Sequence, residues 1–61
     1  MNGHEERAFQ YRQKAEEVRA MIPDMSDDQT RQTLEKIAAG YEQLANVQEN
    51  LARADKAISK P

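Results

Sequence analysis

The sequence predicts an all-α fold, an antiparallel two-helix hairpin whose second helix is the longer one. Apolar residues recur every three or four positions along most of the 61 residues, which is the spacing of a helix face. Strong helix formers such as alanine, glutamate, glutamine, arginine and lysine are frequent. Only two glycines and two prolines are present, and Pro23 marks the only strong break. We therefore expect residues 1–61 to form a single hairpin.

The first predicted helix spans about residues 4–22 and carries one regular apolar stripe. Four acidic and four basic residues lie between the apolar positions, so the remaining surface is expected to be solvated. Phe9 follows Ala8 directly and therefore lies off the stripe, where it is either an ordinary exposed aromatic residue or a contact with another chain. The stripe has the alternating spacing of a heptad seam and consists of Ala8, Tyr11, Ala15, Val18, Ile22 and Met25.

The turn is predicted at about residues 23–26. Pro23 lacks a backbone donor and disfavours helical geometry in the residue before it. Ser26 followed by Gln29 is a capping-box pattern, in which the serine hydroxyl accepts a backbone N–H of the new helix. The second helix is therefore expected to start at this serine and to span about residues 27–58.

The second predicted helix presents two apolar faces, one after the other. At about 100° per residue, the centre of the apolar surface shifts by roughly a quarter turn between its two halves. A single partner helix would cover only one face. The first face contains Leu34, Ile37, Ala38, Tyr41, Leu44 and Ala45. We expect the seam between the two helices to contain Tyr11, Ala15, Val18, Ile22, Leu34, Ile37, Tyr41 and Leu44. The second face contains Leu44, Val47, Leu51, Ala54 and Ile58.

Gly40 stands inside the second helix, where it costs about 1 kcal/mol relative to alanine. Ala38, Ala39 and Ala45 nearby are also small. This segment is either a place where another helix approaches closely or one that tolerates a surface glycine.

The unequal helix lengths predict an uncovered end. At about 1.5 Å per residue, the first helix is about 28 Å long and the second about 48 Å. Folded back at the turn, the first helix covers the second only to about residue 45, with Tyr11 near Ile37 or Ala38. Residues 46–61 would overhang, and this segment either frays or is covered by another chain. We therefore expect a homo-oligomer, most simply a dimer arranged as a four-helix bundle or coiled coil, with Leu51 as the anchor of the interface.

No catalytic, cofactor or metal site is predicted. Cysteine is absent, which excludes thiolate ligands and disulfides. His4 is the only histidine, and its neighbours Glu5 and Glu6 point away from it on a helix. We expect this histidine to be exposed. Neither a nucleophile–base arrangement nor a glycine-rich phosphate loop is present, so the chain is not expected to be an enzyme.

Charge and hydropathy limit the classes of partner that we expect for this chain. The formal net charge is −2, which argues against nucleic-acid binding because that function needs a basic surface. No apolar run approaches the roughly 20 residues that span a membrane, and the first residues lack the features of a signal peptide. The expectation is a cytoplasmic protein that contacts neither membranes nor nucleic acid.

Two segments resemble a known group of proteins. Residues 11–17, YRQKAEE, and residues 34–45, LEKIAAGYEQLA, are similar to segments of short uncharacterised bacterial helical-hairpin proteins. The resemblance covers roughly residues 11–45. It implies a bacterial cytoplasmic protein, and it carries over neither an activity nor a functional residue.

These observations predict a non-enzymatic protein–protein interaction module that self-associates or docks on a larger partner in a regulatory or assembly role. The alternative is a small structural subunit of a larger complex. A transcriptional regulator or antitoxin would require a basic face or a DNA-reading element, which we do not find. The candidate interaction residues are Phe9, Tyr41, Leu44, Val47, Leu51, Ala54 and Ile58.

Overall fold

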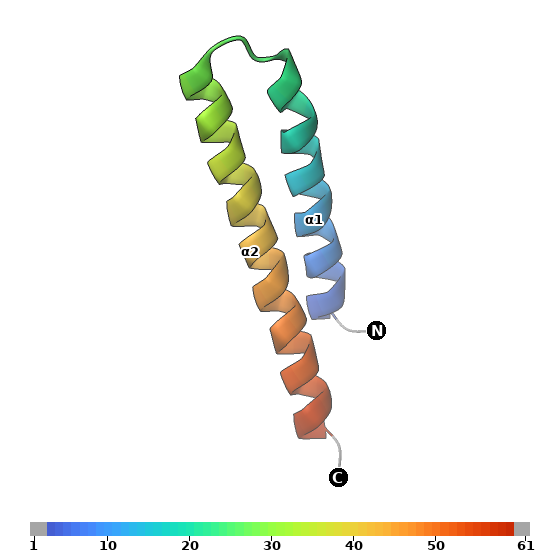
Figure 1. The fold of residues 1–61 in the computed structure, drawn as a ribbon. Helices are drawn as coiled ribbons and strands as arrows, with labels where there is room; N and C mark the ends of the chain where they lie inside the picture. Colours follow the sequence, from blue (N-terminus) through green and yellow to red (C-terminus); the bar gives the residue numbers. More distant parts are fainter. Residues whose placement is uncertain (1–2, 60–61) are drawn as a thin grey trace.

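The computed structural model describes residues 3–59, with side chains described through residue 56. Helix α1 (Gly3–Met21) and helix α2 (Asp28–Ser59) run antiparallel and are joined by the short 3-10 helix η1 (Ile22–Asp24) (Figure 1). The described residues contain no strand, so the predicted all-α hairpin is confirmed. The helix ends lie within one residue of the predicted ones. The Cα trace is a thin rod of 55 × 16 × 10 Å.

The connection between the helices depends on proline and on an aspartate cap. Pro23 lies in the first turn of η1, where its missing N–H costs little. Met25 is extended and its N–H donates to the carbonyl oxygen of Ile22 at 3.0 Å. Asp27 caps α2, because its Oδ2 accepts the backbone N–H of Thr30 at 3.0 Å and the Thr30 hydroxyl at 2.7 Å.

The predicted Ser26–Gln29 capping box is therefore wrong by one residue. An ionised carboxylate accepts hydrogen bonds more strongly than a serine hydroxyl. Asp27 also supplies the first carbonyl of the helical ladder, which accepts the N–H of Arg31 at 3.0 Å. The two hydrogen bonds from Thr30 lower the pKa of the Asp27 carboxyl.

The seam between the helices consists mainly of alanine. On α2 the residues that face α1 recur every seventh position as Ala38, Ala45 and Ala52. Ala8, Ala15 and Val18 are the buried residues of α1. Side chains this small allow two helix backbones to approach closely. The placement of Ile37 and Leu44 in this seam was a wrong prediction, since both are more than two-fifths exposed.

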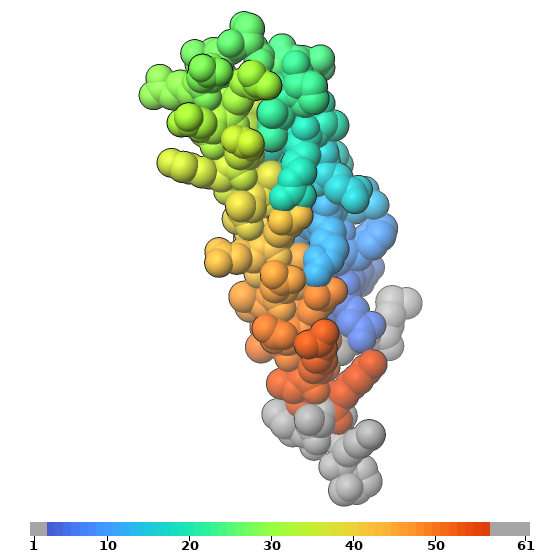
Figure 2. All heavy atoms as spheres, in the orientation of Figure 1, coloured from blue at the N-terminus to red at the C-terminus, as the bar shows by residue number. Residues whose placement is uncertain are grey.

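The register of the hairpin also differs from the prediction. Tyr11 stacks on Tyr41, with ring centroids 6.3 Å apart, one helical turn beyond the position expected. Met25 is half-buried, and η1 packs against both α1 and α2. Helix α1 therefore covers α2 further along than residue 45, although the last turns of α2 still extend past α1 (Figure 1). The space-filling view shows the two helices in contact along a single narrow body (Figure 2).

Candidate interaction surface

A continuous uncovered stripe runs along α2 beside the alanine seam. Its four large members are exposed by 42% at Ile37, 44% at Leu44, 50% at Val47 and 43% at Leu51. Gly40 and Ala54 fill the remaining positions at the same alternating spacing of three and four. We call these six residues the α2 stripe. The two apolar faces of α2 therefore lie side by side over the same length, and the predicted sequential arrangement is wrong.

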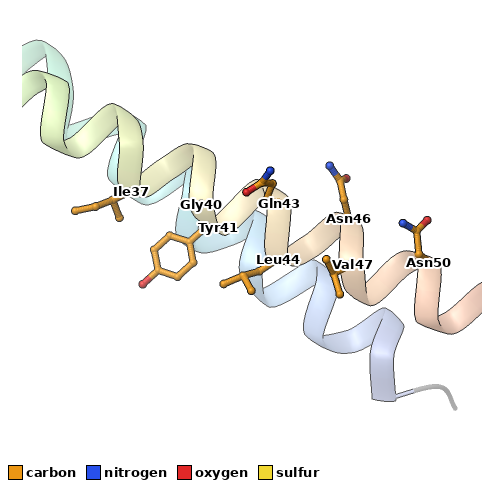
Figure 3. Close-up of a pocket in the computed structure, with 8 residues that line it drawn as sticks. All are labelled: Ile37, Gly40, Tyr41, Gln43, Leu44, Asn46, Val47 and Asn50. Carbon is orange, nitrogen blue, oxygen red and sulfur yellow. The ribbon is translucent and has the colours of Figure 1, made fainter.

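A shallow groove follows the stripe. Figure 3 shows Ile37, Tyr41 and Leu44 on one side of the groove, and the amide side chains of Gln43, Asn46 and Asn50 on the other. None of these side chains is charged. The residues that line the groove are Ile37, Gly40, Tyr41, Gln43, Leu44, Asn46, Val47 and Asn50.

Charge is almost absent around the α2 stripe. Helix α2 contains nine charged residues between Asp28 and Lys56. At about 100° per residue, seven of the nine lie more than a right angle from the centre of the stripe. Lys36 and Asp55 are the other two, and they flank its two ends. Between them the flanking positions carry only uncharged side chains. This surface thus has the charge depletion that is typical of the core of a protein interface.

The other edge of the hairpin carries ion pairs. Arg12 Nη2 lies 2.7 Å from Glu49 Oε1 and 3.2 Å from Asn46 Oδ1, and Arg19 pairs with Glu42. The Arg19 hydrogen bond lowers the pKa of the Glu42 carboxyl and raises that of Arg19. The charged residues of these pairs recur at every seventh position of each helix. We call the row that they form the ion-pair edge.

The end of the ion-pair edge and the single histidine show how far α1 reaches. Lys56 Nζ lies 3.5 Å from Glu5 Oε1. His4 is half-buried, and its Nδ1 lies 2.7 Å from Gln48 Oε1, so the expectation of an exposed histidine is wrong. These contacts correct the start of the predicted overhang, because α1 contacts α2 beyond residue 46, at Gln48, Glu49 and Lys56. The last turns of α2 still extend past α1 (Figure 1).

The candidate residues do not share one surface. Leu44, Val47, Leu51 and Ala54 lie on the α2 stripe, and Tyr41 flanks it. Phe9 is 63% exposed, but it lies on α1 one turn before Arg12 and hence on the side of the ion-pair edge. The side chain of Ile58 lies outside the described residues.

Sequence reasoning placed one member of this surface elsewhere and left the role of another open. Ile37 was assigned to the intrachain seam, and Gly40 was not included among the interaction candidates. The signal that could have found both is the second heptad phase of α2, which connects Ile37, Gly40 and Leu44 without interruption.

The search for known relatives gave no match among protein-family models, curated proteins or solved structures. Within the described residues, no group of three or more histidine, cysteine, aspartate or glutamate side chains could hold a metal ion. Neither described helix is both long and apolar enough to cross a membrane.

Proposed function

We propose that this chain is a non-enzymatic protein–protein interaction module that self-associates through the α2 stripe. The observation that carries the proposal is the exposure of Ile37, Leu44, Val47 and Leu51 on one continuous helix edge. Fully burying a side chain of this size stabilises a protein by about 1.5–3 kcal/mol. The four side chains are 42–50% exposed, so a partner that covers them gains roughly half of this free energy at each position.

The thin core of the hairpin supports the same proposal. The buried residues are alanines and one valine, and among the described residues no large side chain is fully buried. Apolar burial at about 25 cal/mol per Å² competes with an ordering cost of roughly 1.5 kcal/mol per residue in a chain this small. Coverage of the α2 stripe by a second chain would add the burial that the intrachain seam lacks. Folding and association would then be linked.

Light scattering coupled to size-exclusion chromatography, with circular dichroism on the same samples, tests the proposal. The unaltered chain should elute with a dimer mass, and its Tm should rise with protein concentration. Leu51→Glu places a charge on the stripe and should produce a monomer with a lower Tm. Ala39→Glu adds the same charge to an exposed position of α2 away from the stripe, and should leave the dimer intact.

Self-association would be rejected by a monomer mass together with a Tm that does not depend on concentration. Such a result would favour the alternative in which the chain is a subunit of a larger complex.

A further inference from the structure

We propose that two copies of this chain pair antiparallel through α2, with Leu51 of each copy seated over Gly40 of the other. This arrangement rests on the proposed function and specifies its partner, orientation and register. It places a two-fold axis beside Ala45 and Asn46. It also makes the contact one helix against one helix, with both copies of α1 outside it.

The order of large and small residues selects the antiparallel orientation. Along α2 the stripe alternates between bulky Ile37, Leu44 and Leu51 and the smaller residues Gly40, Val47 and Ala54. Antiparallel helices place each bulky position against a smaller position of the partner. Each pair of facing residues forms one layer of the contact, and the layers then have similar volumes. The layers are then Leu51 with Gly40, Leu44 with Val47, and Ile37 with Ala54. Parallel helices would stack leucine on leucine and glycine on glycine.

Within a single hairpin, no feature of the structure requires a glycine at position 40. Its φ is not positive, and a Cβ built at this position meets no heavy atom of neighbouring side chains or of α1 within 4 Å. Glycine is nevertheless unfavourable in a helix interior compared with alanine. A leucine of a second copy needs the space that a side chain at this position would fill. The inferred register thus gives Gly40 a role.

The few charges near the stripe agree with this orientation. In the antiparallel register, Lys36 of one copy comes to the same level along the helix axis as Asp55 of the other, at each end of the contact, with the two residues on opposite flanks of the stripe. In a parallel pair, Lys36 would lie level with Lys36, and Asp55 with Asp55. Opposite charges at each end attract, whereas like charges within about 10 Å repel. The order of charges along α2 is therefore complementary to the order in a second, antiparallel copy of the same helix.

The amide side chains along the flank that carries Lys36 are also self-complementary. Gln43 and Asn50 lie on the same edge of the groove (Figure 3). In the inferred register, Gln43 of one copy lies nearly level with Asn50 of the other. Each amide group both donates and accepts hydrogen bonds, so the pair can form twice around the two-fold axis.

Helix α1 adds only Met21, which is 44% exposed, to the apolar surface on the side of the α2 stripe. Its edge on the side of the α2 stripe contains Arg7, Lys14 and Met21, which lie across the seam from the ion-pair edge. Arg7 and Lys14 are exposed, and Lys14 pairs with Glu17 at 3.8 Å. The proposed dimer therefore has an α2–α2 contact in place of the shared four-helix core that the sequence suggested.

Cross-linking of engineered cysteines tests the orientation, because the chain has no cysteine of its own. Gly40→Cys and Leu51→Cys are prepared separately and treated with a short bismaleimide, alone and as an equimolar mixture. The antiparallel register predicts at least about tenfold more cross-linked dimer in the mixture than in either variant alone, since only the mixture brings two thiols together at high effective concentration. Ala39→Cys, away from the stripe, should cross-link poorly with both.

The outcomes separate this inference from the proposed function. If each variant cross-links to itself as well as in the mixture, the chain self-associates but the antiparallel orientation is wrong. A monomer mass for the unaltered chain, with no cross-link in any sample, would instead remove both proposals. Should Leu51→Cys itself prevent association, the flanking variants Gln43→Cys and Asn50→Cys decide the orientation in the same way without removing an apolar side chain.

Discussion

The two long edges of α2 have opposite chemistry although they flank the same alanine seam. One edge presents Glu42, Glu49 and Lys56, which pair with charged residues of α1. The other presents Ile37 and Leu44, among other apolar residues, and both remain more than two-fifths exposed. The difference indicates separate roles for the two edges: charge specifies how the hairpin closes, and the apolar edge stays exposed. In the dimer that we propose, a second chain covers the apolar edge.

The two edges also differ in how much free energy their contacts contribute and in how specific those contacts are. Exposed ion pairs gain little free energy because water screens them, but a reversed series of charges fits only one register and one rotation of α2. Apolar surface has little directional preference, yet its burial contributes far more free energy. Variants at the two edges should therefore have separable effects.

The largest effect is expected at the seam between the two edges. Ala45 is 0% exposed, and Ala45→Leu inserts a bulky side chain where the two backbones are close together. Overpacking of this kind costs about 1–3 kcal/mol, so the variant should lose helicity and association together. Thermal melts followed by circular dichroism measure the loss. Ala39→Leu, the same change at an exposed alanine, is the control, and equal melting of the two variants would contradict the alanine seam.

A smaller and more selective effect is expected at the apolar edge. Gly40→Leu fills the space that the antiparallel pair needs, while leucine is the better helix former. Association should weaken by at least about tenfold, or 1.4 kcal/mol, with helicity preserved at concentrations where the variant is monomeric. Sedimentation equilibrium measures the dissociation constant. If Gly40→Leu dimerises as tightly as Ala39→Leu, the contact between Leu51 and Gly40 is wrong.

The sequence predicted the hairpin but not the rotation of α2 within it. Two heptad phases of this helix are apolar, and the phase with Ile37 and Leu44 has the larger side chains. Hydropathy therefore favoured that phase, whereas packing selected the alanine phase of Ala38 and Ala45. What could have decided between them is the series of charges on α2, which complements Glu5, Arg12 and Arg19 only when the alanines face α1.

The register and the cap were missed for local reasons. A capping box starting at Ser26 and an aspartate cap one residue later have nearly the same sequence pattern, and only the hydrogen bonds of Thr30 distinguish them. The register depends on the path of residues 22–27, because η1 and the extended Met25 displace α1 along α2. Backbone geometry of such a connection is not encoded in hydrophobic periodicity.

The cap of α2 should have a moderate effect that depends on pH. Asp27→Ala removes both hydrogen bonds from Thr30, and we expect the Tm to fall by on the order of 5 °C at pH 7. Ser26→Ala should leave the Tm unchanged. Since folding lowers the pKa of the Asp27 carboxyl, its contribution is present above the unfolded pKa and is lost as the pH falls through the folded one. The difference between Asp27→Ala and the unaltered chain should therefore shrink in acid, and a constant difference would argue against the cap.

The ion-pair edge should show a weaker effect that depends on salt. Arg12→Gln removes the contacts with Glu49 and Asn46, and it should cost about 0.2–1 kcal/mol at low ionic strength. Screening should reduce this loss as salt is added. Chemical denaturation with urea at two salt concentrations measures it, because urea does not add charge. A loss that is equal at both concentrations would show that Arg12 acts through packing of its aliphatic stem.

The smallest effect is expected at Phe9, although it is the most exposed of the large hydrophobic residues that the structure describes. An exposed aromatic residue alone is a natural candidate for a contact, but Phe9 lies on the side of the ion-pair edge, away from the stripe. In the proposed dimer the α2 contact leaves this side open to solvent. Phe9→Ala should therefore change neither the dissociation constant nor the Tm beyond the error of sedimentation and thermal melts, whereas Leu44→Ala on the stripe should weaken association. Weaker association of Phe9→Ala would place the ion-pair edge inside the interface, and the two edges of α2 would then no longer have separate roles.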